Sequence, residues 1–107
     1  MSTEEPNQAE PAISLETRRR LDLLFSEEDR PAATRLLAEE CGKNLPFLEK
    51  LDERGLERFQ FAALKLSQGD LNLLGKAVKL AQTDWRDLLM AAGFGHDTTA
   101  HERWNAT

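Results

Sequence analysis

The stretch that decides the fold is LERFQFAALKLSQGDLNLLGKAVKLAQTDWRDLLMAAGF, residues 56–94. It contains three runs of apolar residues at helical spacing, separated by polar residues and glycines. Gly69 and Asp70 divide the first run from the second, and Asp84 precedes the third. Glycine ends helices readily, and a side-chain oxygen starts them by accepting a backbone hydrogen bond. The pattern predicts three consecutive short helices, the last of them closed by Gly93.

Two further helices are expected before this stretch. The first covers residues 15–25, and Ser14 precedes it as a residue type that caps helix N-termini. The second runs from about Arg30 to Cys41, with Pro31 in its first turn. Gly42 stands where a left-handed residue ends many helices, so we expect the second helix to stop there.

The end of the chain carries one more start signal. Thr99-Ala100-His101-Glu102 matches a capping box, which predicts one or two helical turns that return Trp104 to the body of the protein. Short connections between helices favour packing of consecutive helices as hairpins. We therefore expect an all-α protein, a single irregular bundle of about five short helices with a short C-terminal helical turn.

Composition places the folded domain at residues 13–107. Residues 1–12 are acidic and poor in apolar side chains, so we expect a disordered tail that buries too little surface to fold. Three acidic charges lie in this tail, which leaves −2 of the net charge of −5 to the rest of the chain. Such a balance implies no general attraction to nucleic acid or to anionic membrane.

The expected location is the cytoplasm, because the N-terminus lacks the apolar run of a secretory signal and no stretch approaches the roughly 18 apolar residues of a membrane span. The single Cys41 excludes an internal disulfide, and a position at a helix C-terminus disfavours a thiolate. His96 and His101 match no usual metal-ligand spacing. We expect no metal, no cofactor and no catalytic residue.

The segments EECGKNLP (39–46), RFQFAALKLS (58–67) and LAQTDWRDLLMAAGF (80–94) together resemble a group of small uncharacterised bacterial all-helical proteins. The resemblance implies a single bacterial helical domain. It brings no catalytic or binding residue with it, and the acidic tail lies outside it. Function therefore has to be argued from the residues themselves.

The densest polar and aromatic cluster is Thr83-Asp84-Trp85-Arg86-Asp87. In the structural interpretation, which we favour, Thr83 or Asp84 caps the next helix, Asp87 interacts with its dipole and Trp85 is buried. In the functional interpretation, the charged residues surround an exposed Trp85 as a recognition surface. Paired carboxylates also permit acid–base chemistry, but no second cluster supplies the cleft that shifts pKa values.

The aromatic side chains outnumber what a small core has to bury. Phe59 and Phe61 point about 200° apart on one helix, so both reach the core only if that helix is covered on two sides. We therefore expect one of them on a partner surface. The leading hypothesis is a non-enzymatic domain that binds a protein partner or associates with itself. The candidate partner-binding residues are Phe59, Phe61, Trp85, Arg86 and Trp104.

The alternative hypothesis is a nucleic-acid-associated regulator. Arg18, Arg19 and Arg20 form the only basic run, although they spread over about 200° of helix surface and have acidic neighbours. Lys76 and Lys79, which are one helical turn apart, would extend the contact. A solvated helix face explains the arginines better, so nucleic acid is the less favoured partner.

Overall fold

The computed structural model describes residues 13–106; the expected tail at residues 1–12 lies outside the described residues. In chain order the helical elements are α1 (Leu15–Leu24), α2 (Arg30–Arg35), the π-helical η2 (Leu36–Lys43), the 3₁₀ turn η3 (Leu48–Lys50), α3 (Glu53–Ser67), α4 (Leu71–Thr83), α5 (Trp85–Ala92) and α6 (Ala100–Arg103). No strand occurs between residues 13 and 106, and the predicted all-α bundle of about five helices is confirmed.

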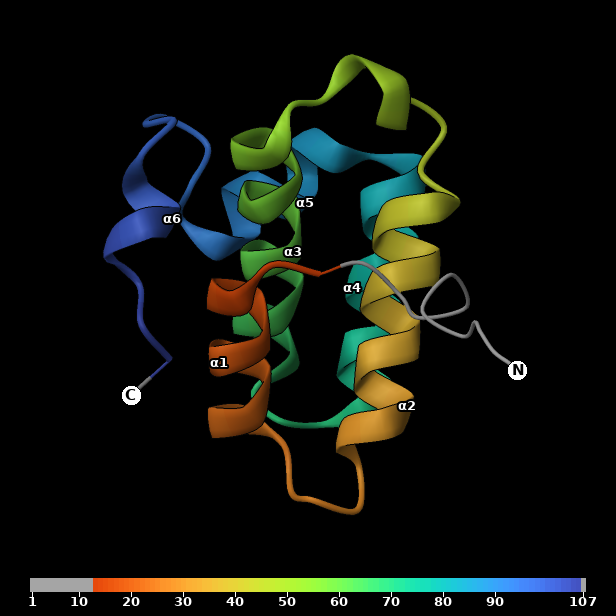
Figure 1. Cartoon of the computed structure of the whole chain (residues 1–107). Coiled ribbons are helices and arrows are strands. Elements are labelled where there is room, and N and C mark those ends of the chain that lie inside the picture. Colours follow the sequence, from red (N-terminus) through yellow and green to blue (C-terminus); the bar gives the residue numbers. More distant parts are fainter. Residues whose placement is uncertain (1–12, 107) are drawn as a thin grey trace, which may run out of the picture.

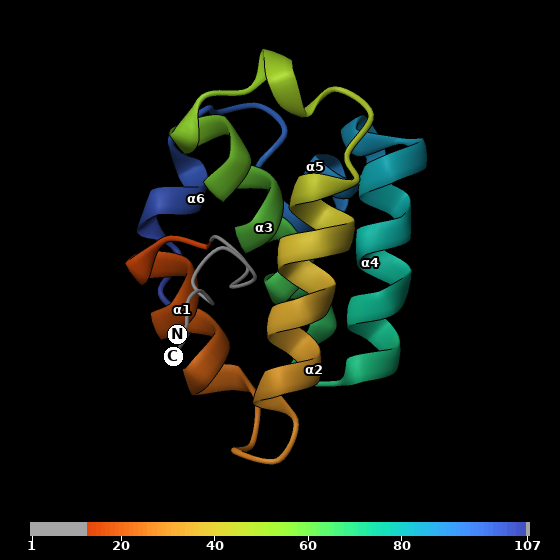
Figure 2. The same ribbon diagram turned by 45° about the vertical axis from the view of Figure 1, so that its right-hand side comes forward.

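The helix α3 occupies the centre of the bundle (Figure 1) and packs against α1, η2, α4, α5 and α6. The helices α1 and α2 form a hairpin, and α2 continues into η2 alongside α4 (Figure 2). α6 lies on the opposite side of α3 from α4 (Figure 1). Within the described part of the chain, no helix combines the length and the hydropathy that a membrane crossing needs.

The central helix is buried on both of its sides. Phe59 contacts Trp85 of α5, whereas Phe61 contacts His101 of α6. The exposed fractions of the two phenylalanines are 4% and 1%. The expectation that one of these rings lies on a partner surface is therefore wrong, because neighbouring helices cover α3 on two sides. A helix surrounded in this way buries residues around its whole circumference.

Three of the predicted helix starts are confirmed together with their side-chain caps. Ser14, Asp70 and Asp84 each accept a hydrogen bond from a main-chain N–H two or three residues further on. The predicted end of α5 is confirmed as well. Gly93 adopts a φ of 80°, and the N–H of Phe94 donates to an earlier carbonyl in the pattern of a Schellman motif.

The reversal between α3 and α4 depends on Gly69. Gln68 and Gly69 both adopt left-handed conformations, with φ angles of 52° and 82°. A Cβ atom on Gly69 would lie 2.6 Å from the carbonyl oxygen of Leu24 at the end of α1. Glycine is therefore required here for its conformation and for the close approach of another backbone.

The second helix ends near the expected residue but in a different conformation. It widens into the π-helical η2 and continues to Lys43, and the N–H of Asn44 donates to the carbonyl of Glu39 at 2.7 Å. Gly42 is buried and does not adopt a left-handed conformation. The expectation of a left-handed Gly42 is wrong; the break in helical dihedral angles lies at Cys41, with φ −115° and ψ 37°.

Two glutamines from other helices complete the end of η2. The last carbonyls of any helix lack partners within it, and Pro46 has no N–H to offer. Gln82 of α4 donates to the carbonyl of Glu40 at 2.7 Å, and Gln60 of α3 donates to the carbonyl of Cys41 at 3.2 Å. Side chains thus tie η2 to both neighbouring helices at the point where its own hydrogen-bond pattern ends.

The predicted C-terminal turn exists as α6, but the predicted capping box does not form. The side chain of Thr99 makes no cap hydrogen bond, and its hydroxyl donates to Asp97 at 2.9 Å instead. Arg103 binds the other oxygen of the same carboxylate at 2.8 Å. The guanidinium of Arg103 and the N–H and hydroxyl of Thr99 hold the pKa of Asp97 well below its ordinary value.

Candidate interaction surface

Trp85 opens α5 with its ring against two other aromatic rings. Its centroid lies 5.7 Å from that of Phe59 and 6.2 Å from that of Phe47, and the two phenylalanines meet edge to face at 5.5 Å. Phe59 is buried, but 37% of Trp85 is exposed. The expectation of a buried Trp85 is wrong, because the two phenylalanines cover only part of the indole.

The guanidinium of Arg86 lies over the indole of Trp85. Its guanidinium carbon lies 5.3 Å from the centre of the Trp85 ring, a cation–π arrangement. Within residues 13–106, no carboxylate forms an ion pair with Arg86. The neighbouring Asp84 has a structural task, since its carboxylate accepts from the N–H of Asp87 at the start of α5.

Met90 adds an exposed apolar side chain to the same helix. It is 65% exposed and follows Arg86 by one helical turn, so the two residues share a face of α5. We call Trp85, Arg86 and Met90 together the Trp85 surface. It combines an aromatic ring, a guanidinium and a thioether, all side-chain types that protein interfaces favour.

Phe61 and Trp104, two further partner-binding candidates, belong to a second aromatic cluster that packs the C-terminal segment. Their ring centroids are 6.3 Å apart, and Trp104 is partly buried. The guanidinium of Arg20 lies 4.1 Å from the centre of the Phe61 ring, and its Nε donates to the carbonyl of Trp104 at 2.8 Å. These contacts give both aromatic residues a structural role.

The three consecutive arginines of α1 do not form one basic surface. Arg18 donates to Thr34 at 2.9 Å, and Arg19 pairs with Glu16 at 2.9 Å. Arg20 is only 3% exposed, so the expectation of a solvated face is wrong for this residue. The run is therefore committed largely to contacts within the protein.

The two lysines of the nucleic-acid hypothesis lie on another helix. Lys76 and Lys79 are both exposed on α4. α4 packs on α3 and η2, whereas α1 packs on α2 and α3. Nothing in this arrangement joins the lysines and the arginines into a continuous basic stripe.

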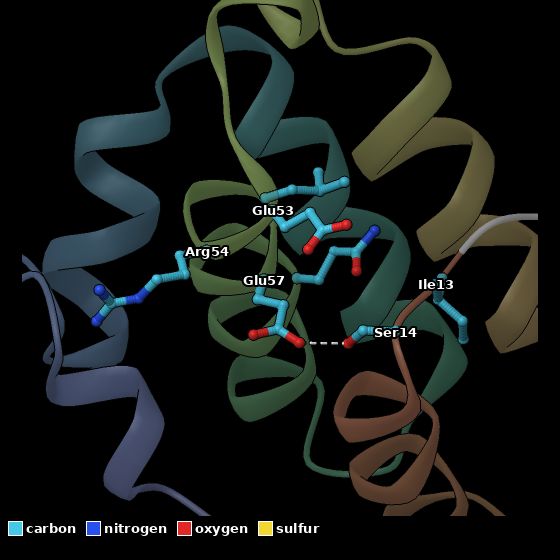
Figure 3. A pocket seen from close by; sticks show the side chains of 7 residues that line it. Ile13, Ser14, Glu53, Arg54 and Glu57 are labelled. Carbon is cyan, nitrogen blue, oxygen red and sulfur yellow. Dashed lines mark hydrogen bonds between the residues drawn. The ribbon is translucent and has the colours of Figure 1, made fainter.

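A pocket of about 350 Å³ opens between the start of α1 and the first turns of α3 (Figure 3). The hydroxyl of Ser14 donates to the carboxylate of Glu57, which points toward it across the opening. Arg54 is bound to Glu102 at 2.6 Å. Most polar groups of the pocket are thus engaged by other residues of the protein, and we assign it no ligand. Its lining consists of Ile13, Ser14, Glu53, Arg54, Leu56, Glu57 and Gln60.

The surroundings of Cys41 and of the two histidines bear on covalent and metal chemistry. Cys41 is fully buried, and burial raises the pKa of its thiol to about 12. His96 is exposed in a loop, whereas His101 is buried. Among the described residues, no group of three histidine, cysteine, aspartate or glutamate side chains is close enough to hold a metal ion.

Sequence reasoning missed two residues that shape these clusters. Phe47 packs against Trp85, although the two residues lie about forty positions apart in the sequence. His101 was expected in the first turn of the C-terminal helix without a packing role, and it is 1% exposed. No local sequence pattern predicts either contact, because both depend on how segments distant in the sequence pack together.

The chain matches no protein-family model, and comparison with curated proteins and with solved structures finds no relative.

Proposed function

We propose that this chain is a non-enzymatic protein-interaction domain and that its partner binds the Trp85 surface. The observation that carries the proposal is the partly exposed indole of Trp85, which packs against Phe47 and Phe59 and has Arg86 over its ring. Tryptophan and arginine are the residue types that most often dominate binding energy at protein interfaces.

The support beneath Trp85 favours binding through its low entropic cost. A side chain that is already packed on two rings loses little rotamer freedom when a partner covers it. The exposed apolar carbons of the indole favour binding, because a partner that covers them excludes water from them. Trp85 is therefore suited to be a preorganised anchor.

Arg86 indicates the chemistry of the partner. Its guanidinium forms no ion pair with a carboxylate of the described residues, so its donors are open to an acceptor from outside. The partner that fits is a protein segment with an apolar side chain for Trp85 and an adjacent carboxylate for Arg86. A planar guanidinium binds a carboxylate through two parallel hydrogen bonds.

Site-specific photo-crosslinking tests the proposal. A photoreactive phenylalanine analogue placed at Trp85 should give one discrete crosslinked protein in an extract of the source organism, and the same analogue at the exposed Lys76 should not. An excess of the unmodified chain should abolish the product. No product at position 85, or equal products at both positions, would refute a partner at this surface.

A further inference from the structure

His101 is buried between the rings of Phe61 and Phe94, which we call the cage. Its ring centroid lies 5.4 Å from that of Phe61 and 6.3 Å from that of Phe94, and the residue is 1% exposed. Neither Nδ1 nor Nε2 has a hydrogen-bond partner within the described part of the chain. Buried polar groups are almost always paired, so this ring occupies an unusual position.

The cage accepts a neutral imidazole but has nothing ready for a charged one. A neutral ring leaves one N–H unpaired, whereas a protonated ring would leave two N–H donors and a full charge buried among apolar atoms. Burial accordingly lowers the pKa of His101 below its ordinary value of 6.5.

The charged groups that face His101 do not supply a free counter-ion. On its own helix, Glu102 lies 4.0 Å from Nε2 but is bound to Arg54 of α3 at 2.6 Å. Glu57 of α3 is bound to Ser14. After burial, which is the largest influence, the negative charges of Glu102 and Glu57 raise the pKa of His101, and the positive charges of Arg58 and Arg54 lower it.

Two more charged residues border the same segment from other directions. The guanidinium of Arg20 in α1 lies over the Phe61 ring and donates a hydrogen bond to the carbonyl of Trp104. Asp97, in the loop before α6, is occupied by Arg103. The acidic groups near a protonated His101 are therefore already bound to other residues of the protein, and positively charged groups lie near it as well.

The segment that carries His101 contains only a short helix. α6 has four residues, too few for a helix that is stable alone. Its contacts with the rest of the protein include the buried His101, the partly buried Trp104, the exposed pair between Arg54 and Glu102 and the bond from Arg20. Such a segment is a natural unit of local opening.

We propose that residues 97–106 form a pH-sensitive latch, which closes over Phe61 and Phe94 when His101 is neutral and opens when His101 takes up a proton. Opening hydrates the imidazolium and exposes the two phenylalanine rings to solvent. In the open state the histidine has an ordinary pKa near 6.5. Above that pH it is neutral in both states, so the closed state keeps its full stability. The ratio of open to closed latch then rises up to about tenfold for each pH unit below about 6.5, until the pKa of the buried ring is reached.

The test uses the full chain and amide hydrogen exchange measured at several pH values between 8 and 5, corrected for the intrinsic pH dependence of exchange. Protection of residues 97–106 should fall below pH 6.5 while protection of α3 and α4 is retained. His101→Phe, which fills the cage without a titrating group, should keep the segment protected across the range. His101→Leu serves the same purpose should phenylalanine overfill the cage.

Replacement of the other histidine provides the matched control. His96→Gln should keep the wild-type transition, because His96 is exposed in the loop. The latch is refuted by protection of residues 97–106 that does not change with pH, by a transition that survives in both His101 variants, or by simultaneous loss of protection in all helices.

Discussion

Arg20 Nε donates a 2.8 Å hydrogen bond to the main-chain carbonyl of Trp104, which joins the first helix to the last described turn of the chain. The same guanidinium lies 4.1 Å from the centre of the Phe61 ring and binds Glu16 at 2.7 Å. One buried arginine thus connects three parts of the fold.

We predict that Arg20→Met lowers the free energy of unfolding by about 2 kcal/mol, because it removes hydrogen bonds from a charged donor and leaves the Trp104 carbonyl unpaired. Urea denaturation followed by circular dichroism measures the loss. Arg19→Met is the matched control on the same helix; since Arg19 is exposed, its loss should stay within about 0.5 kcal/mol. Equal effects of the two variants would contradict the role of Arg20.

Gln60 provides a second test of the buried polar contacts. It is 1% exposed, accepts from the hydroxyl of Thr17 and donates to the carbonyl of Cys41. Gln60→Leu should cost about 2 kcal/mol of unfolding free energy, since it removes the donor to the buried Cys41 carbonyl and leaves Thr17 with only its bond to Ser14. Gln82→Leu should cost less, because Gln82 is only partly buried and water can replace it. The reverse order in urea melts would show that Gln60 does not link α3 to η2 and α1.

Two glycines should respond to alanine with opposite signs. Gly69→Ala should lower stability by more than about 1 kcal/mol, because its left-handed φ and the nearby Leu24 carbonyl exclude a Cβ atom. Gly75→Ala should raise stability by about 0.5–1 kcal/mol, since this glycine lies within α4 and a Cβ there meets nothing within 4 Å. Thermal melts of the two variants distinguish the cases, and a neutral Gly69→Ala would contradict the described turn.

Cys41 should resist thiol reagents in the native state. It is the only cysteine, it is fully buried, and its pKa is raised to about 12, so almost no thiolate exists at neutral pH. Reaction with a chromogenic disulfide at pH 8 should proceed at the rate of opening of the protein and become fast in urea. Rapid stoichiometric reaction without denaturant would place Cys41 at the surface.

The local signals of the sequence predicted the helix starts and the end of α5. Ser14, Asp70 and Asp84 cap as expected because the cap contact spans only two or three residues. Gly93 ends α5 for the same local reason. The all-α class followed from these signals and the helical spacing of apolar residues.

Contacts between distant segments were beyond prediction from local pattern. Phe59 and Phe61 lie on opposite sides of α3, and only the placement of α5 and α6 shows that both are covered. Gly42 does not adopt the expected left-handed conformation, and Gln60 and Gln82 satisfy the carbonyls of Cys41 and Glu40 from other helices.

The candidate site was predicted in part. Trp85 and Arg86 were named as partner-binding candidates from their cluster of polar residues, and the structure places them together. The support from Phe47 and the exposure of Met90 came only from tertiary packing.

The contribution of Arg86 to the Trp85 surface gives the most direct test. In the crosslinking reaction from position 85, unlabelled chains compete for the partner, and the concentration for half-maximal inhibition of the product is measured. We predict that Arg86→Ala competes about tenfold less well than wild type, the size expected for an interface residue worth about 1.4 kcal/mol. Lys79→Ala should compete like wild type, because Lys79 lies on α4. Equal competition by Arg86→Ala and Lys79→Ala would contradict binding at the Trp85 surface.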